Sequence, residues 1–490
     1  YGLLKESLHR FFPKNAENQI NWQKIAGLSS ALKQFCVISG GPGTGKTFTI
    51  VKILALLIEQ AGNDPIKIAL AAPTGKAAAR LGKTLKMARH TLQCSQRIID
   101  AIPVEARTIH RLLKPVPNTP YFQYNAENRL PADLVVIDEA SMVDLALMSK
   151  LMQALADTTR FILVGDKDQL ASVEAGAVLG DICNRGNTHR FSSCFGRQVK
   201  ELTGEKIRFL SEADNRQSGL ADCIVSLKKN YRFPDTGGIG ELSRSINQGN
   251  GDHTLTLLKS DGDISIRWQP VSSYSELNRN LGKCIIRGYE KYITAQDPAQ
   301  AIAFFNQFRL LCAVKKGPFG VEAINQLAEQ VLMREGLLQA NHSADDPWYA
   351  GRPILITKND YNLGLFNGDT GITWLQTEAN GIHRGHLLNV FFPIADLTGE
   401  LRPIPPYRLS DHETVYAMTV HKSQGSEYDN LHLILPDTDA PVLSRELLYT
   451  AVTRARKTVT IWGKVEILTS AIDRRIRRTS GLRDALWGRV

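Results

Sequence analysis

The sequence predicts an α/β fold of two lobes with parallel sheets, and three observations lead to this prediction. Short apolar runs alternate with helical segments along most of the 490 residues, a pattern typical of parallel strands joined by crossover helices. The first apolar run leads directly into a glycine-rich loop at residues 40–47. A second alternating series begins after Tyr231 and contains no such loop. We therefore expect two similar lobes that share one ligand.

Each expected strand is followed by a polar loop near its C-terminal end, which is the edge where ligands bind in open α/β sheets. Four such loops in the first series would converge on one ligand. A helix is expected over 48–60, directly after the glycine-rich loop. The expected strands are 36–39, 66–72, 134–137 and 161–164 in the first series, and 310–314, 415–420, 431–435 and 459–462 in the second.

Two segments interrupt these series. The stretch 114–120 is rich in Pro and Asn, which indicates a small insertion that projects from the first sheet. Residues 353–357, 371–375 and 387–392 alternate or run apolar between Gly and Asn turns, which indicates a small β-barrel-like (SH3-like) insertion. The expected domains are an N-terminal remnant or linker at 1–20, the first lobe (1A) at 21–111 and 132–222, an insertion (1B) at 112–131, the second lobe (2A) at 223–350 and 412–490, and a β-rich insertion (2B) at 351–411.

The composition favours a polyanionic partner and argues against a membrane protein. Lys and Arg total 59 against 49 Asp and Glu, so the formal net charge is +10. The seven cysteines are odd in number and form no C-x-x-C pair, which favours reduced thiols in a cytoplasmic protein. No apolar stretch reaches the length of a membrane span, and no signal peptide opens the chain. We therefore expect a cytoplasmic protein with no membrane contact.

The loop Gly40-Gly41-Pro42-Gly43-Thr44-Gly45-Lys46-Thr47 has the pattern of a phosphate-binding loop between a strand and a helix. Its glycines let consecutive backbone N–H groups point at phosphate oxygens, and the helix that follows directs the positive end of its dipole there. Lys46 would reach the β and γ phosphates of ATP, and Thr47 would offer its hydroxyl to Mg²⁺. The alternative, a glycine-rich turn that binds nothing, is disfavoured by this setting. The loop residues expected on the nucleotide are Gly41, Gly43, Thr44, Gly45, Lys46 and Thr47.

Polar residues at the ends of two further strands predict the hydrolytic groups. Asp138 and Glu139 directly follow the strand at 134–137, so Asp138 would hold Mg²⁺ through water and Glu139 would be the general base. Adjacent acids are also common on solvated loops, and the phosphate-binding loop upstream favours the functional interpretation. Gln169 follows the strand at 161–164 and would hydrogen-bond the γ-phosphate or the attacking water. An ordinary loop glutamine is an equally good interpretation of Gln169.

Three later segments add weaker signals. Tyr231 and Arg232 pair a ring that can stack on adenine with a guanidinium that can bind a phosphate. His421 and Lys422 lie in a hydroxyl- and amide-rich loop after a strand, where they would meet nucleic-acid phosphates without reading bases. A metal site on His421 is disfavoured because no second ligand lies at a suitable spacing. Residues 448–456 are helical in period, and Arg454 would reach the γ-phosphate from the second lobe.

Together these segments resemble superfamily 1 DNA helicases, and they are most similar to the RecD subunits of the bacterial exodeoxyribonuclease V complex, RecBCD. The likeness covers nearly the whole chain from Asn21 onward. Long strings carry it more specifically than any single motif does. Besides the motifs above, these strings are 21–24, 72–81, 108–112, 138–141, 170–178 and 363–369.

The resemblance implies two RecA-like lobes and a motor that moves 5'-to-3' along single-stranded DNA. It implies a complex with a 3'-to-5' motor (RecB-like) and a scaffolding subunit (RecC-like) that acts on duplex DNA ends in break repair. It also implies a further N-terminal domain before Tyr1 and, because the 1B insertion is short, a reduced strand-splitting hairpin. By this resemblance Gln23 reads the adenine and Glu427 contacts the ribose. The residues it places along the single strand are Thr74, His110, Thr419, His421 and Lys422.

Three hypotheses remain at this stage. The first is an ATP- and Mg²⁺-dependent motor on single-stranded DNA that advances about one nucleotide per ATP, as the resemblance implies, and binds with strong salt dependence. The second is a regulatory or structural subunit whose ATPase only controls a partner motor or nuclease. The third is a phosphate-loop ATPase that acts on something other than nucleic acid, which the basic balance and the loop at 421–427 disfavour.

Overall fold

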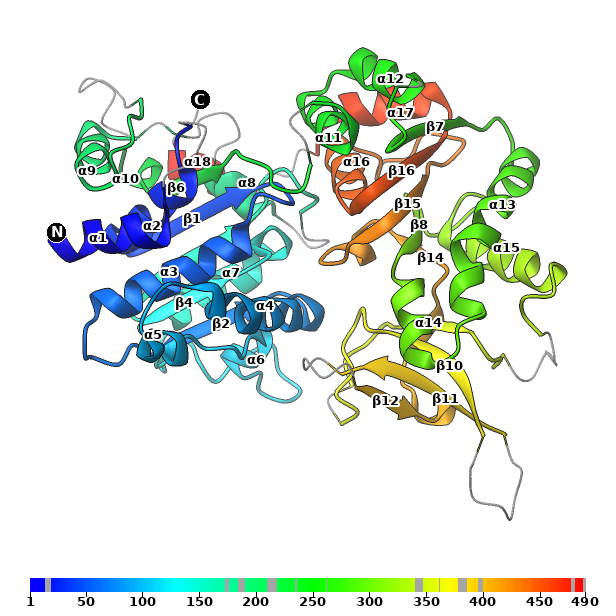
Figure 1. Cartoon of the computed structure of the whole chain (residues 1–490), viewed down its shortest axis with the longest axis horizontal. Coiled ribbons are helices and arrows are strands. Elements are labelled where there is room, and N and C mark those ends of the chain that lie inside the picture. Colours follow the sequence, from blue (N-terminus) through cyan, green and yellow to red (C-terminus); the bar gives the residue numbers. More distant parts are fainter. Residues whose placement is uncertain are drawn as a thin grey trace. The chain divides into compact units, whose positions relative to one another are not determined.

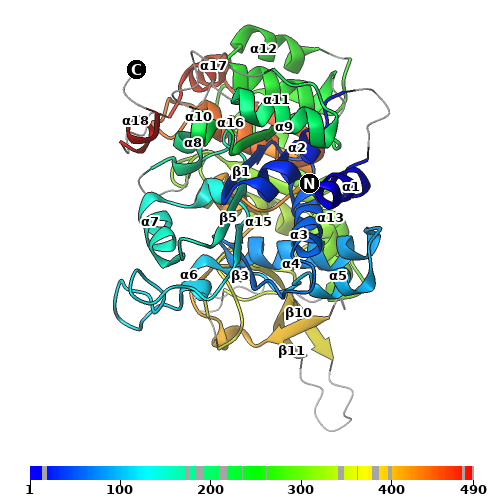
Figure 2. The same cartoon turned by 90° about the vertical axis from the view of Figure 1, so that its left-hand side faces the viewer.

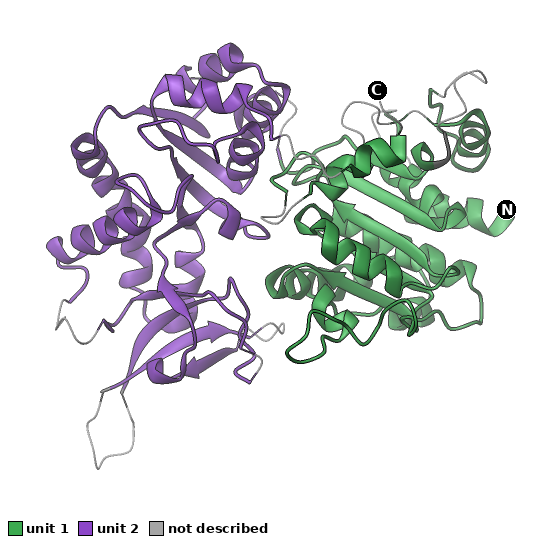
Figure 3. Cartoon of the chain, turned by 180° about the vertical axis from the view of Figure 1, so that it is seen from behind, with its two compact units in different colours: residues 1–232, 477–490 green, residues 233–476 purple. Residues whose placement is uncertain are grey.

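The computed structural model describes residues 1–13, 19–171, 176–183, 189, 191–208, 218–233, 236–260, 262–339, 347–360, 362–377, 386–394, 400–476 and 481–487. Part of the string 170–178 quoted above therefore lies outside the described residues. The chain divides into two compact units (Figure 3). Unit 1 comprises Tyr1–Arg232 with Arg477–Val490, and unit 2 comprises Phe233–Ile476. Each unit contains a parallel sheet with helices, which confirms the predicted α/β class.

Unit 1 is built on a six-stranded parallel sheet with the strand order β3-β2-β4-β5-β1-β6 (Figure 1). The four central strands are apolar along most of their length, as expected where a parallel sheet is covered on both faces. Strand β1 lies between β5 and β6, with Ser39 opposite Gly165 and Ser226. The strands are β1 (Phe35–Gly40), β2 (Ile68–Ala72), β3 (Arg107–Thr108), β4 (Leu134–Ile137), β5 (Arg160–Gly165) and β6 (Ile224–Leu227).

Helices cover both faces of this sheet, because alternate strand residues belong to two different cores. Cys36, Ile38 and Val136 pack with α1, α2, α3 and α9, whereas Val37 and Val135 pack with α6, α7 and α8. Figure 2 shows α3 and α7 on opposite sides of the strands. The helices of unit 1 are α1 (Gly2–Phe11), α2 (Trp22–Leu32), α3 (Lys46–Gln60), α4 (Gly75–Ala88), α5 (Gln96–Ala101), α6 (Ile109–Leu113), α7 (Leu145–Ala154), α8 (Val178–Ile182), α9 (Ser193–Thr203), α10 (Ser218–Ala221) and α18 (Leu482–Trp487), with short 3₁₀ turns η1 (Arg89–Thr91) and η2 (Ala140–Met142).

The Pro- and Asn-rich stretch forms a small hairpin after α6. The Val116 amide donates to the Tyr121 carbonyl at 3.0 Å, and the Gln123 amide donates to the Lys114 carbonyl at 2.8 Å. Tyr121, which directly follows the turn at 117–120, is exposed. A local insertion was predicted at this place, and its short length gives a correspondingly short hairpin.

Unit 2 is built on a five-stranded parallel sheet with the order β14-β8-β15-β16-β7. Its strands are β7 (Ile266–Pro270), β8 (Phe308–Cys312), β14 (Ala417–Thr419), β15 (Tyr428–Ile434) and β16 (Ala455–Gly463). Its helices are α11 (Gly238–Gln248), α12 (Gly251–Lys259), α13 (Tyr274–Ile293), α14 (Pro298–Phe305), α15 (Val321–Arg334), α16 (Arg445–Val452) and α17 (Val465–Asp473), with a 3₁₀ turn η5 (His421–Ser423).

The β-rich insertion of unit 2 forms a separate antiparallel sheet with the order β12-β11-β10-β9-β13. It has its own small core, which includes Ile354, Val390, Phe392 and Ile404. The three strands predicted here are present, whereas closure into an SH3-like barrel stays a prediction. The elements are β9 (Pro353–Ile356), β10 (Thr370–Thr377), β11 (His386–Pro393), β12 (Leu401–Ile404), η4 (Pro406–Arg408) and β13 (His412–Thr414).

The unit boundaries differ from the expected domain boundaries. Unit 1 extends to Arg232 rather than 222, because β6 pairs with β1. The chain start is not a linker, since Leu8 and Phe11 of α1 lie in the core of unit 1. The C-terminal segment also belongs to unit 1, where Trp487 Nε1 donates to the Asp181 carbonyl at 3.1 Å.

The expectation that 448–456 is helical throughout is wrong at its end. Helix α16 ends at Val452, and β16 begins at Ala455, so Arg454 lies in the turn between them. Within the described segments, no helix is both long and apolar enough to span a bilayer. All seven cysteines are free, in keeping with the expected reduced thiols.

Candidate nucleotide site and nucleic-acid loop

The glycine-rich loop connects the end of β1 to the start of α3, as its sequence predicts. Gly43 and Gly45 have φ angles of 83° and 79°, which strain any side chain other than hydrogen. A Cβ on Gly43 would lie 2.5 Å from Arg232 Cβ, and a Cβ on Gly45 would lie 2.8 Å from Gln23 Nε2. Both glycines are therefore required by the backbone and by the side chains that close on the loop.

Lys46 lies in the first turn of α3 and turns its ammonium back onto the loop. Its Nζ donates to the Gly40 carbonyl at 2.7 Å and to the Gly41 carbonyl at 3.1 Å. The Thr44 hydroxyl also donates to Gly41, at 2.8 Å. The loop therefore holds a cation at the N-terminus of a helix, where the helix dipole also favours anions. Thr47 follows in the same turn and is half-buried.

Asp138 and Glu139 lie directly beyond the carboxyl end of β4. Burial, reinforced by the negative charge of Glu139, raises the pKa of Asp138 to about 6, while the Glu139 backbone N–H, Lys46 and Arg80 oppose the rise. The Glu139 amide donates to Asp138 Oδ1 at 2.9 Å. Glu139 has a φ of 52°, an uncommon conformation for a residue with a side chain and one that recurs at functional sites. The pair thus joins a buried Asp138, within the field of Lys46, to a half-buried Glu139 with a strained backbone.

Gln169 lies in the loop after β5, next to β1 in the sheet. It is 4% exposed, and its Nε2 donates to Asp166 Oδ2 at 3.1 Å. The Asp168 amide donates to the other oxygen of Asp166, at 3.1 Å. Asp166 therefore fixes the orientation of the Gln169 amide. Burial and this hydrogen bond fit an ordinary loop glutamine as well as a contact to the γ-phosphate or the attacking water, so the role of Gln169 stays a prediction.

The segment 230–232 packs directly on the glycine-rich loop and belongs to unit 1. Asn230 Nδ2 donates to the Pro42 carbonyl at 2.9 Å, and the Tyr231 amide donates to the Gly43 carbonyl at 2.8 Å. The Arg232 amide donates to Asn230 Oδ1 at 2.8 Å. Arg232 is therefore a residue of the loop's own unit, which corrects its expected place in the second lobe. Sequence reasoning gave Asn230 no role, although an asparagine beside a glycine-rich loop is a common local hydrogen-bonding signal.

Gln23 and Tyr231 lie on the same part of the loop, near Gly45. Gln23 Nε2 donates to the Thr44 carbonyl at 3.3 Å. The Tyr231 ring reaches within 3.8 Å of the Cβ position of Gly45 and is 58% exposed. An amide and an accessible ring thus lie side by side at the loop, as a purine would require.

The start of α2, which carries Gln23, is held by a stack that sequence reasoning missed. The Trp22 and His189 rings are stacked nearly parallel with their centroids 3.7 Å apart, and Lys228 Nζ lies 5.1 Å from the centroid of the Trp22 ring. Burial, together with the Lys228 charge, lowers the pKa of His189 to about 4, so the ring is neutral at pH 7. No local pattern in the sequence signals this contact between residues so far apart.

Thr74 and His110, the unit 1 residues expected along the single strand, lie just beyond the carboxyl ends of β2 and β3. Thr74 caps α4, and its hydroxyl accepts from the Ala77 amide at 3.2 Å. His110 lies in α6, with its ring 5.7 Å from that of Phe122 in the hairpin. Both therefore lie at the sheet edge from which the glycine-rich loop also extends.

In unit 2, Thr419, His421 and Lys422 form the end of β14 and the turn η5. The Thr419 hydroxyl accepts from the Lys422 amide at 3.3 Å. Lys422 Nζ donates to Glu413 Oε1 at 2.6 Å, which ties this turn to the β-rich insertion. The loop thus offers a hydroxyl, an imidazole and a paired ammonium.

Arg454 and Glu427 lie together at the opposite edge of the unit 2 sheet, just before β16 and β15. Arg454 is 2% exposed, and its guanidinium donates to the carbonyls of Thr450 at 3.3 Å and Ser426 at 3.4 Å. Glu427 accepts from the exposed Arg456 at 3.2 Å. Residues 420–427 connect this pair with the Thr419 end of β14. The nucleotide and nucleic-acid candidates of unit 2 are therefore the two ends of one loop.

The fold and the site together define a phosphate-loop NTPase with a second parallel-sheet unit. Two family models match the chain: an AAA domain at residues 23–175 and a UvrD-like helicase C-terminal domain at residues 414–462. The first match spans the glycine-rich loop and Gln169, and the second spans Thr419 and Arg454. The class of the protein is thus a helicase-type ATPase.

Curated relatives make the assignment more specific. The chain is 35% identical to "RecBCD enzyme subunit RecD" of Haemophilus influenzae, over 98% of this chain and 74% of that protein. It is 38% identical to the protein of the same name in Mycolicibacterium smegmatis, over 97% and 76%. The "ATP-dependent RecD2 DNA helicase" of Deinococcus radiodurans is 29% identical, over 91% of this chain and 49% of its own length.

The chain therefore belongs to the family of RecD subunits of the RecBCD enzyme, and it is an ATP-dependent DNA helicase. A purely regulatory or structural ATPase subunit is not favoured. Among solved structures, the chain is similar to a Bacteroides Pif1 helicase in complex with ADP-AlF3 and ssDNA, at 19% identity and a TM-score of 0.44, over 90% of this chain and 92% of that one. At these values the likeness carries no functional argument.

Proposed function

We propose that this chain is the 5'-to-3' motor subunit of a RecBCD-type complex and that the residues gathered at the unit 1 sheet edge hydrolyse ATP to drive it. One observation carries the proposal. Lys46, the Asp138–Glu139 pair and Gln169 leave adjacent strands at the same edge, and the segment 230–232 closes on the same loop. Such convergence of cations, acids and an amide is what phosphoryl transfer requires.

ATP would lie along the glycine-rich loop. The Gln23 amide and the Tyr231 ring hold the adenine, since both lie beside Gly45. Lys46 leaves its loop carbonyls for the β and γ phosphates, which are stronger acceptors because they are charged. Glu427 of unit 2 would contact the ribose.

The donors present fit a bound Mg²⁺. Thr47 and Asp138 offer a hydroxyl and a carboxylate, the hard oxygen ligands that this ion takes. The raised pKa of Asp138 shows a carboxylate whose charge is poorly compensated, and a cation would stabilise that charge. When bound, Mg²⁺ neutralises charge on the β and γ phosphates.

The protein groups then divide the hydrolytic work. Glu139 accepts a proton from the attacking water, and Gln169, oriented by Asp166, hydrogen-bonds that water or the γ-phosphate. Arg232 from unit 1 and Arg454 from unit 2 stabilise the charge that develops on the γ-phosphate. As a residue of unit 2, Arg454 would contact ATP only while the γ-phosphate is present and would lose that contact after hydrolysis.

That contact connects ATP turnover with the grip on DNA. Arg454 and Glu427 stand at one end of the loop 420–427, whose other end carries Thr419, His421 and Lys422. Thr74 and His110 would hold the same single strand on unit 1. Alternating grip by the two units would move the strand by about one nucleotide per ATP, the expectation for motors of this superfamily.

The partners we propose are RecB-like and RecC-like subunits, with single-stranded DNA and duplex DNA ends as substrates, in the cytoplasm. The proposed partners are supported by several relatives at 33–38% identity that are named as subunits of the RecBCD enzyme. Processing of DNA breaks for recombinational repair would be the task of the whole complex.

The test is the ATPase activity of the purified chain with and without single-stranded DNA. We expect strong stimulation that decreases steeply with salt, because binding rests on phosphate contacts. Activity that does not respond to single-stranded DNA would contradict the proposal.

A further inference from the structure

The part of the unit 2 sheet that β7, β15 and β16 form carries mostly polar side chains on one face, which is unusual for a parallel sheet. Along β15 and β16, Leu431, Leu433, Val459 and Ile461 are fully buried on one face. Parallel sheets are ordinarily covered on both faces, and their strands then read as continuous apolar runs. On the other face the polar side chains are Asn430 and His432 on β15, Thr458 and Thr460 on β16, and Arg267 and Gln269 on β7. Two aromatic side chains on this face, Trp462 on β16 and Phe308 on β8, are nearly buried.

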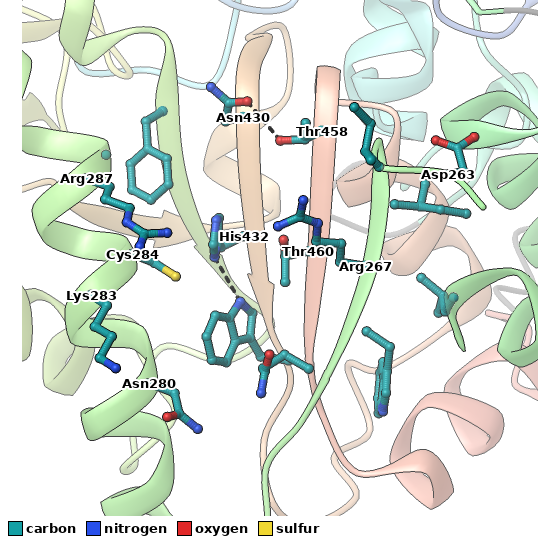
Figure 4. A pocket seen from close by; sticks show the side chains of 18 of the residues that line it. Asp263, Arg267, Asn280, Lys283, Cys284, Arg287, Asn430, His432, Thr458 and Thr460 are labelled. Atoms are coloured by element: carbon teal, nitrogen blue, oxygen red, sulfur yellow. Dashed lines mark hydrogen bonds between the residues drawn. The ribbon is translucent and has the colours of Figure 1, made fainter. Parts of the chain in front are cut away.

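A groove of about 1010 Å³ lies over this polar face. Figure 4 shows Asn430, His432, Thr458 and Thr460 on its floor, between α13 on one side and β7 on the other. The groove is lined by exposed cations on both sides: Lys259, Arg267, Lys283, Arg287 and Lys291. We call this feature the basic groove.

The cations of α13 form a row. Lys283, Arg287 and Lys291 are spaced four residues apart, which places them on one face of the helix about 6 Å apart along its axis. Among the described residues, no ion pair joins any of the five lining cations to a carboxylate. Their charge is therefore available to a ligand.

Asp263, the acid that lines the groove, forms no ion pair with the described cations of α13. Asp263 accepts from the Ser265 amide at 2.8 Å, and hydrogen bonds from Ser265 lower the pKa of its carboxyl. Asp263 thus caps the turn before β7. It is the one carboxylate among the described residues that line the groove.

The floor of the groove is neutral and fixed. Trp462 Nε1 donates to His432 Nδ1 at 2.9 Å, and the Thr458 hydroxyl donates to Asn430 Oδ1 at 2.8 Å. Burial, with the nearby Arg267, lowers the pKa of His432 to about 4. Positive charge in the groove therefore comes from its rims at pH 7, with hydrogen-bonding groups between them.

The chemistry of the groove favours a protein segment over a nucleic acid. Sequence-independent sites for single strands pair cations with aromatic rings on which bases stack. Here Trp462 and Phe308 are 2% and 5% exposed, and the other lining aromatic residues, Trp268 and Phe304, are half-buried. The exposed apolar side chain on the rim is Ile264, at 77%. Cations beside an exposed isoleucine complement an acidic segment that carries apolar side chains.

We propose that the basic groove binds an acidic segment of a partner subunit in the RecBCD-type complex. The inference rests on the proposed function, because it takes the partner to be the RecB-like and RecC-like pair. A partner segment in the groove would cover the polar sheet face and neutralise the cations of α13 and β7. Electrostatic complementarity of this kind governs both the rate of association and its salt dependence.

The test compares two double charge reversals in the full chain. The groove variant is Arg287→Glu with Lys291→Glu. The matched control is Arg279→Glu with Arg334→Glu, two exposed arginines that do not line the groove. Affinity for the purified RecB-like and RecC-like pair is measured at low and high salt. We expect the groove variant to bind at least about tenfold more weakly at low salt, with a smaller difference at high salt, and the control to bind as the wild type does.

Two further readouts separate the possible failures. Hydrogen exchange of the wild-type chain should show protection of 266–270 and 280–291 on complex formation. Single-stranded-DNA-stimulated ATPase of the chain alone should be equal in the wild type and both variants. Three results would overturn the inference: equal partner affinity of the two variants, absence of that protection, or a wild-type chain that forms no complex. In each case a normal ATPase response to single-stranded DNA would still support the motor function. Selective loss of DNA stimulation in the groove variant would assign the groove to nucleic acid and also overturn it.

Discussion

The two parallel sheets of this chain have the same architecture but are used differently. In unit 1 the central strands β4 and β5 are buried along nearly their whole length, and the proposed hydrolytic residues lie at the carboxyl edge. In unit 2 the strands β7, β15 and β16 alternate between buried and accessible residues, and the candidate functional residues lie at two ends of the loop 420–427. The unit 1 sheet thus carries most of the proposed hydrolytic residues. The unit 2 sheet carries Arg454, the proposed γ-phosphate contact, and a polar groove on one face.

This contrast predicts that variants of the unit 1 residues proposed for hydrolysis abolish ATP turnover, whereas Arg454 variants of unit 2 keep ATP binding and lose turnover. Lys46→Gln should reduce ATP hydrolysis by about 10⁴-fold or more, because it removes the cation that serves both binding and the transition state. The assay is steady-state ATPase with saturating single-stranded DNA. Lys67→Gln, an exposed lysine near the amino end of β2, is the control. Comparable activity of the two variants would show that the loop does not bind the phosphates.

Arg454→Ala should lower kcat for ATP by about 10³-fold, the usual contribution of an arginine delivered to a γ-phosphate. The control is Arg456→Ala, two residues away but exposed and paired with Glu427, for which we expect a change of at most a few-fold. Binding of a fluorescent ATP analogue should survive in both variants. If both variants lost activity equally, the special role of Arg454 would be refuted.

Asp138→Asn should stabilise unit 1 at neutral pH while it destroys activity. The folded-state pKa of Asp138 is raised, so its stabilising contribution is fully present below the unfolded value of 3.8 and is lost as pH rises through about 6. A neutral asparagine avoids this loss, which is on the order of 3 kcal/mol. Urea unfolding without nucleotide or metal should show the gain at pH 7.5 and a smaller gain at pH 5. Asp64→Asn, at an exposed loop position, should show neither, and a gain independent of pH would contradict this account.

Asn230→Ala should have the smallest effect, about a tenfold rise in KM for ATP. The variant loses hydrogen bonds to Pro42 and to the Arg232 amide, each worth about 1 kcal/mol, and so loosens Tyr231 and Arg232 on the loop. A fall in kcat with unchanged KM would instead place Asn230 in the chemical step. Asn63→Ala, an exposed asparagine in the turn that follows α3, is the matched control.

The same contrast explains what the sequence could predict. The glycine-rich loop and the Asp138–Glu139 pair are local patterns at the ends of apolar strands, so these candidate site residues of unit 1 could be predicted from the sequence alone. Strands β6 and β7 were missed because Ile224–Leu227 is short and Ile266–Pro270 is half polar. The boundary at Arg232 and the stack of Trp22 on His189 depend on pairings between distant segments, which no local period encodes. Arg454 was placed in a helix because the helical period continues past Val452 into a turn.

The central claim is that ATP turnover at the unit 1 loop moves this chain 5'-to-3' along single-stranded DNA. Displacement of streptavidin from oligonucleotides biotinylated at one end tests it most directly, with the wild-type chain and the Lys46→Gln variant. We predict ATP-dependent displacement from the 3' end, little from the 5' end, and none with the variant. Displacement that is equal at both ends, or undiminished by Lys46→Gln, would contradict the account.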